Sequence, residues 1–160
     1  SQMNAGAAVA QGRVLLFLHA DTVLPAQADV AVLQAVAGGA GWGRFDVDIS
    51  GRSRWLPVVA GMMNRRSRLT GIATGDQALF VRVDWFRQIG GYATQPLMED
   101  IELCRRLRRL GRPACLRERV LTSGRRWETR GVWRTIVLMW RLRWRYWRGA
   151  TPEALAQAYR

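Results

Sequence analysis

The stretch Val14-Leu-Leu-Phe-Leu-His-Ala-Asp-Thr22 joins an unbroken apolar run to an abruptly polar end. A short apolar run of this kind is typical of a buried strand, and apolar side chains on both faces predict a strand in the middle of its sheet. A helix-like segment, 4–11, precedes it and ends at Gly12. This order predicts a layered α/β fold in which Asp21 lies just past the carboxyl end of a central strand, where open α/β sheets bind ligands.

Strand and helix patterns alternate along the rest of the chain. Extended segments are predicted at 43–49, 77–83 and 113–122. Helices are predicted at 26–37, 54–68, 84–89, 99–110 and 131–148, followed by a last helix that starts at Thr151. No internal repeat is present. We therefore predict an α/β domain over residues 1–127 and an Arg/Trp-rich amphipathic helical tail over residues 128–160.

Arginine supplies all 25 basic residues, and the formal net charge is +13. Residues 1–100 carry 9 Arg against 8 acidic residues, whereas residues 101–160 carry 16 Arg against 4. The positive charge predicts an anionic partner for the C-terminal part: phosphate, nucleic acid or membrane headgroups. Cys104 and Cys115 have neither metal-ligand nor redox spacing, so we expect two buried thiols in a reducing compartment.

Asp21 and Asp76-Gln77 are two of three acidic sites in the sequence. A carboxylate at a strand end beside an anionic substrate is suited to hold Mg²⁺ or Mn²⁺, because these hard cations prefer oxygen ligands and bridge phosphates. The alternative for Asp21 is a cap of the next turn. Asp76-Gln77 enters a predicted strand, where it either contacts a hydroxylated substrate or forms a plain turn.

The third acidic site, Glu99-Asp100, starts a predicted helix. At helical spacing, Asp100 shares one face with four apolar residues, Leu103, Cys104, Leu107 and Leu110. That face must pack on the sheet, so the carboxylate of Asp100 is expected to point inward and to serve as a general base. The alternative is that Glu99 or Asp100 only caps the helix or offsets its dipole.

In this order the three sites resemble the family 2 glycosyltransferases of the GT-A fold, a Rossmann-like fold of nucleotide-diphospho-sugar transferases. In that family an apolar strand ends in Asp-x-Asp, which here reads His19-Ala20-Asp21. Later family motifs are matched by 75–77, by Gly90-Gly91-Tyr92 and by Glu99-Asp100. Some members have Gln-x-x-Arg-Trp, matched by Ser123-Gly-Arg-Arg126-Trp127 with Ser in place of Gln. Several motifs in the family's order are a fairly specific signal.

The resemblance implies a bacterial enzyme that moves a sugar from a nucleotide-diphosphate donor to a hydroxyl acceptor. The reaction would be a metal-assisted, inverting single displacement with Mn²⁺ or Mg²⁺ as cofactor. The implied roles are catalysis by Asp100 with Glu99, metal and diphosphate binding by Asp21, further donor contacts by His19 and Arg126, and acceptor contacts by Asp76, Gln77 and Trp127. The alternatives are a hydrogen-bonded strand end for His19, and a solvated arginine beside a packed tryptophan for Arg126-Trp127.

The family's first βαβ unit, a unit of ~30 residues or more, has no counterpart in this chain, which also does not begin with Met. We therefore expect the C-terminal portion of a longer enzyme, with an N-terminally truncated GT-A domain. An inactive fragment is the alternative.

Tryptophan and arginine dominate the segment 132–148. One stripe at helical spacing contains Trp133, Ile136, Val137, Trp140, Trp144 and Trp147, and another contains Arg134, Arg141, Arg145 and Arg148. Such a helix suits a membrane interface, where a lipid-linked acceptor would be found. The alternative is that the stripe packs on the sheet or on the missing N-terminal part. No apolar stretch reaches the length of a membrane span and no signal peptide is recognisable, so we expect a cytoplasmic protein held peripherally at the inner face of the cytoplasmic membrane.

Two other classes of function remain open. A nucleic-acid-binding module would use the arginine-rich part, but no known nucleic-acid motif is present, so we expect no nucleic-acid partner. A nucleotidyltransferase with a similar layered fold would need a Gly-rich phosphate loop upstream of these residues.

Overall fold

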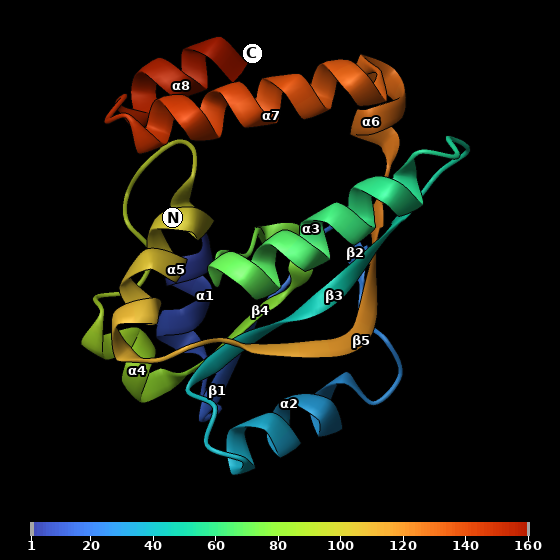
Figure 1. Ribbon diagram of the computed structural model, residues 1–160. Helices are drawn as coiled ribbons and strands as arrows, with labels where there is room; N and C mark the ends of the chain where they lie inside the picture. Colours follow the sequence, from blue (N-terminus) through green and yellow to red (C-terminus); the bar gives the residue numbers. More distant parts are fainter. Residues whose placement is uncertain (1, 160) are drawn as a thin grey trace.

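A mixed five-stranded sheet is the centre of the computed structural model, which describes residues 2–159 (Figure 1). The strands are β1 Val14–Phe17, β2 Thr22–Val23, β3 Trp42–Ser50, β4 Leu79–Arg82 and β5 Ala114–Ser123. Their order across the sheet is β1-β4-β3-β5-β2. Strand β3 is parallel to β5, and the β1/β4, β3/β4 and β2/β5 pairs are antiparallel. The predicted α/β class is therefore confirmed.

The position of β1 differs from the prediction. Within residues 2–159, β1 is an edge strand that pairs with β4 alone. Leu15 and Phe17 are buried, as the apolar run predicted, but Leu16 is 36% exposed and Leu18 is 37% exposed. The prediction of a central strand was wrong for this sheet because, among the described residues, β1 has a paired strand on one side only.

Helices cover the sheet on both sides. Helix α2 (Ala28–Ala37) lies against one face and α3 (Leu56–Thr70) against the other (Figure 1). Both contribute to a core cluster with β3, in which Phe45 and Val47 have no exposed surface. Apolar burial of this extent supplies most of the stability of such a layered fold.

The contact between α3 and β3 is polar as well as apolar. Asn64 of α3 accepts a hydrogen bond from the N–H of Val47 at 2.9 Å and donates one to its carbonyl at 3.0 Å. The buried Arg44 donates to Asp46, and Arg68 of α3 donates to the other oxygen of Asp46 at 2.6 Å. These partners satisfy charges that would be costly to bury alone.

A second core cluster lies at the edge of the sheet formed by β1 and β4. Helices α1 (Gln2–Val9), α4 (Val83–Gln88) and α5 (Glu99–Leu110) gather there (Figure 1). Leu103, Cys104 and Leu107 of α5 are buried against β1 and β4. The predicted inward face of α5 is thus confirmed, and this face places Asp100 at the sheet.

The C-terminal segment forms three helices, α6 (Arg125–Arg130), α7 (Val132–Trp147) and α8 (Pro152–Tyr159). Helices α7 and α8 lie side by side across the top of the view in Figure 1. Leu142 and Leu155 form a third core cluster with Met98, which directly precedes α5. In residues 2–159, no helix combines the length and the apolar composition that crossing a membrane requires.

Candidate functional site

A large open cleft lies between the sheet and the C-terminal helices, with a volume of about 1490 Å³. Its walls come from the end of β1, from the short 3₁₀ helix η1 (Gly75–Gln77), from the start of α5, and from α3, α6 and α7. The predicted site residues that line it are His19, Asp21, Asp76, Glu99, Asp100, Arg126 and Trp127. The carboxylates from the strand end and from the helix start therefore share one cleft.

Pairing of β2 with β5 brings two of the predicted motifs together. The hydroxyl of Thr22 donates to that of Thr122 at 3.0 Å, and the N–H of Ser123 donates to the carbonyl of Asp21 at 3.2 Å. Two motifs that are distant in sequence therefore meet beside the exposed side chain of Asp21.

Asp100 is partly buried in the first turn of α5, and its carboxylate is held by two backbone donors. The N–H of Gly75 donates to Oδ2 at 3.0 Å, and the N–H of Ile101 donates to Oδ1 at 2.8 Å. Burial raises the pKa of Asp100 above its usual value, although both donors and the positive charge of Arg143 oppose the rise. The result is an oriented carboxylate with enhanced basicity.

Glu99, next to Asp100, also has a raised pKa. Burial is the main cause, and the negative charge of Asp100 adds to it. His19 opposes the shift. Neighbouring carboxylates of this kind hold protons more readily than isolated ones.

His19 lies among the carboxylates. Its Nδ1 is 3.4 Å from Oδ1 of Asp76, and both side chains are about two-fifths exposed (40% and 41%). The hydrogen bond to Asp76 raises the pKa of His19, burial opposes this, and the charges of Asp76, Asp100 and Asp21 raise it further. The neighbouring carboxylates therefore favour the protonated form of His19.

Gly75 connects His19 with Asp100. A Cβ at residue 75 would lie 2.0 Å from Nε2 of His19, so only glycine allows the imidazole to approach the backbone here. The N–H of the same residue holds Asp100. The glycine directly before Asp76 is visible in the sequence. The reason that a glycine is needed there is not, because the contact with His19 forms only in the folded chain.

Gln77 is not at the cleft. Its side chain has no exposed surface; it donates to Oδ1 of Asn64 at 3.3 Å and to Oγ of Ser67 at 3.1 Å, and it accepts from the N–H of Thr74 at 3.4 Å. The predicted contact of Gln77 with an acceptor is therefore not supported. Gln77 instead anchors the segment that carries Gly75 and Asp76 to α3.

Arg126 and Trp127 line the cleft from α6. The guanidinium of Arg126 lies over the ring of Tyr159, 5.5 Å from its centroid. Trp127 is half-buried and packs against the first core cluster. The alternative of a solvated arginine beside a packed tryptophan thus describes part of the arrangement, although both side chains still face the cleft.

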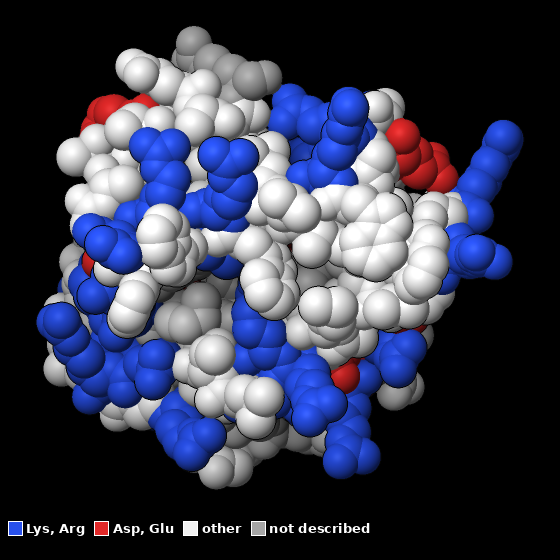
Figure 2. All heavy atoms as spheres, turned by 45° about the horizontal axis from the view of Figure 1, so that its top comes forward, with Lys and Arg blue, Asp and Glu red and all other residues white. Residues whose placement is uncertain are grey.

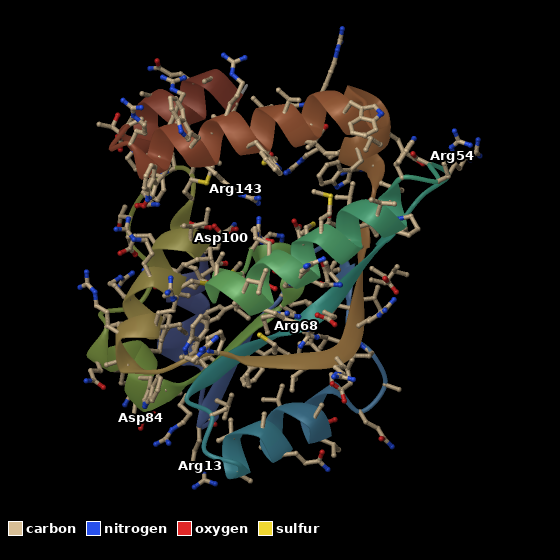
Figure 3. All side chains as sticks on the ribbon, viewed as in Figure 1. Arg13, Arg54, Arg68, Asp84, Asp100 and Arg143 are labelled. Carbon is tan, nitrogen blue, oxygen red and sulfur yellow. The ribbon has the colours of Figure 1, made fainter. Side chains whose placement is uncertain are left out.

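Among the further arginines that line the cleft, Arg66 of α3 and Arg143 of α7 were not predicted as site residues from the sequence. Figure 3 shows Arg143 extending from α7 towards Asp100. No local pattern marks either residue, because each is one arginine among many on its helix and only the packing of α7 over the cleft brings the two together.

The donor set for a metal ion is small. Among residues 2–159, no three His, Cys, Asp or Glu side chains gather closely enough to hold one ion. Mg²⁺ is usually bound by one or two carboxylates together with substrate phosphates, rather than by an all-protein cage. Asp21, exposed in the cleft, fits that mode of binding.

Comparison with known proteins found no protein-family model that matches the sequence and no curated protein that matches it. The chain is characterised by its mixed α/β fold and by the carboxylates and arginines that converge on this cleft.

Proposed function

We propose that this chain is a GT-A-type glycosyltransferase domain that moves a sugar from a nucleotide-diphosphate donor to a hydroxyl acceptor. One observation carries the proposal: the carboxylates of Asp21 and Asp100 line the same cleft, and that of Asp100 is oriented by two backbone donors. These are the two groups that the reaction needs at separate points, one beside the leaving diphosphate and one beside the acceptor hydroxyl.

Asp100 is the general base of this proposal. Its carboxylate takes the proton of the acceptor hydroxyl while the hydroxyl oxygen attacks the anomeric carbon and the bond to the diphosphate breaks. The raised pKa makes the carboxylate a better proton acceptor, while the bonds from Gly75 and Ile101 keep it in position. A base on the side opposite the leaving group gives inversion at the anomeric carbon.

The donor side of the cleft is assigned to Asp21, His19 and Arg126. Asp21 would hold Mn²⁺ or Mg²⁺, an ion that neutralises charge on the leaving diphosphate when it is bound. His19, with its raised pKa, and Arg126 add charge-assisted hydrogen bonds to the same group. The acceptor is assigned to Trp127, which would stack on a sugar ring, and to Asp76, which would accept a hydrogen bond from a hydroxyl.

The acceptor is proposed to be lipid-linked, with α7 at the surface of the membrane. Trp133, Val137, Trp140, Trp144 and Trp147 of α7 are between 55% and 81% exposed, whereas Ile136 of the predicted stripe packs against the core. Figure 2 shows arginine over much of the face that carries α7 and α8. Exposed tryptophan among arginine suits anionic headgroups, and Trp140 also lines the cleft.

The base assignment is tested by Asp100→Asn. Release of nucleoside diphosphate from a panel of sugar nucleotides is measured with Mn²⁺ or Mg²⁺ and candidate acceptors. Loss of the base should lower kcat by about 100-fold or more. Asp29→Asn, in the first turn of α2 on the opposite face of the sheet, is the matched control and should retain full activity. Unchanged transfer by Asp100→Asn would refute the assignment.

The membrane contact is tested by co-sedimentation with vesicles of phosphatidylcholine, with and without anionic phosphatidylglycerol. Binding should require the anionic lipid and should fall when Trp144 and Trp147 are both replaced by Ser. Equal binding of the double variant, or retention of the protein by DNA instead of vesicles, would contradict a membrane role for this face.

A further inference from the structure

Two arginines from different helices lie near each other in the cleft. Arg66 and Arg143 are both partly buried and both line it. Burial, together with the positive charge of Arg143, lowers the pKa of Arg66 to about 10, and burial lowers the pKa of Arg143 as well. Like charges brought together in a partly buried site destabilise each other unless an anion separates them.

The two guanidinium groups lack partners within the described part of the chain. Nε and Nη2 of Arg66 are buried without a hydrogen bond, and neither arginine forms an ion pair among residues 2–159. Asp100 is the carboxylate whose charge acts on both, but its oxygens already accept from Gly75 and Ile101. Buried donors without acceptors cost free energy that a bound anion would recover.

We propose that Arg66 and Arg143 form a phosphate-binding subsite on the Asp100 side of the cleft. This inference rests on the proposed sugar transfer and specifies a charged group of its substrates. The guanidinium fork matches phosphate oxygens in pairs, so two arginines with free donors suit a dianion better than a neutral sugar. The subsite also assigns a role to α7, which contributes Arg143 to the cleft.

The phosphate belongs to one of two substrates. It is either the diphosphate of the donor or a phosphate carried by the acceptor, for example in a lipid-linked phosphate. The charge of the base Asp100 acts on both arginines. This position favours the acceptor, because the hydroxyl that attacks must lie beside Asp100.

The subsite is tested by calorimetric titration of the 160-residue chain with inorganic phosphate and with pyrophosphate. Arg66→Gln and Arg143→Gln should each weaken binding by about tenfold or more, since each removes charge-assisted hydrogen bonds. The matched controls are Arg65→Gln on α3 and Arg141→Gln on α7, which are exposed and outside the lining of the cleft. Wild-type affinity in the cleft variants, or equal losses in the controls, would overturn the proposal.

Urea unfolding without phosphate distinguishes a ligand site from a structural role. Because the two arginines repel each other and lack partners, both Gln variants should be at least as stable as the wild type. Marked destabilisation of both variants would show that the guanidinium groups hold the fold, and it would overturn the proposal. Arg66→Lys, which keeps the charge but loses the fork, should bind phosphate with intermediate affinity.

Asp21→Asn and Mn²⁺ separate the two sources of phosphate. If the donor diphosphate occupies the subsite, Mn²⁺ should strengthen pyrophosphate binding in the wild type and Asp21→Asn should abolish that gain. If the acceptor phosphate occupies it, binding of inorganic phosphate should be unaffected by Mn²⁺ and by Asp21→Asn. Phosphate binding that depends on Arg66 and Arg143 would stand even if no sugar nucleotide were turned over, so failure of the proposed function remains distinguishable.

Discussion

Two groups of arginines in this molecule differ in their partners. In the body of the domain, the buried Arg44 and the half-exposed Arg68 meet on the carboxylate of Asp46, and Arg68 also donates to the carbonyl of Cys115 at 3.0 Å. In the cleft, Arg66 and Arg143 have no such partners among residues 2–159. Arg66 and Arg68 are separated by one residue of α3, so the difference arises from tertiary packing alone. Arginines with partners stabilise the fold, and those without are available to a ligand.

The largest effect that this comparison predicts is on stability, from Asp46→Ala. Removing the shared carboxylate leaves the buried Arg44 without a counter-charge, and breaking a buried pair in this way costs about 3–5 kcal/mol. Urea unfolding measures the loss. Asp48→Ala, two residues along β3, removes a pair with Arg119 in which both side chains are well exposed, and it should change stability by less than about 0.5 kcal/mol. Similar losses in both variants would abolish the distinction between the two environments.

A smaller effect is expected from Gln77→Ala. This change removes the buried amide that donates to Oγ of Ser67 and to Oδ1 of Asn64, and it should cost about 1–3 kcal/mol. Because Gln77 anchors the segment in which Gly75 holds Asp100, we expect slower sugar transfer as a secondary effect. A variant with wild-type stability would show that η1 is held by other contacts.

The smallest effect is the dependence of stability on pH that His19 contributes. Its pKa is raised in the folded state, chiefly by Asp76. The interaction therefore stabilises the fold fully below the unfolded pKa of 6.5 and is lost as the pH rises through the higher folded value. The difference in unfolding free energy between the wild type and His19→Asn should be greatest near pH 5 and should vanish at alkaline pH. A difference that does not vary between pH 5 and pH 9 would exclude this ion pair.

Local patterns in the sequence predicted which helices and strands form better than they predicted which elements pack or pair with one another. The continuous apolar run predicted the strand β1 and the periodic apolar face predicted the helix α5, and both elements are present. The position of β1 at an edge depends on which segments pair with it, and pairing is a long-range property. The sequence alone carries no information on which face of such a run stays uncovered.

The same distinction applies to the cleft. Asp21 and Asp100 were found because carboxylates at a strand end and at a helix start are recognisable from local context. Gln77 was placed at the cleft because it follows Asp76, yet one residue further along the chain the side chain turns into the interior. Arg66 and Arg143 were missed because their significance lies in the absence of partners, which only the packed structure reveals.

Met98 connects the C-terminal helices to the start of α5. It has a left-handed backbone (φ 64°) directly before α5, and its side chain is buried with Leu142 of α7 and Leu155 of α8. The first turn of α5, which carries Asp100, is thus held in place by contacts with two helices more than forty residues downstream. Shortening the chain at Gly131 would remove these contacts, so the position of the Asp100 carboxylate depends on helices that lie outside the sheet domain.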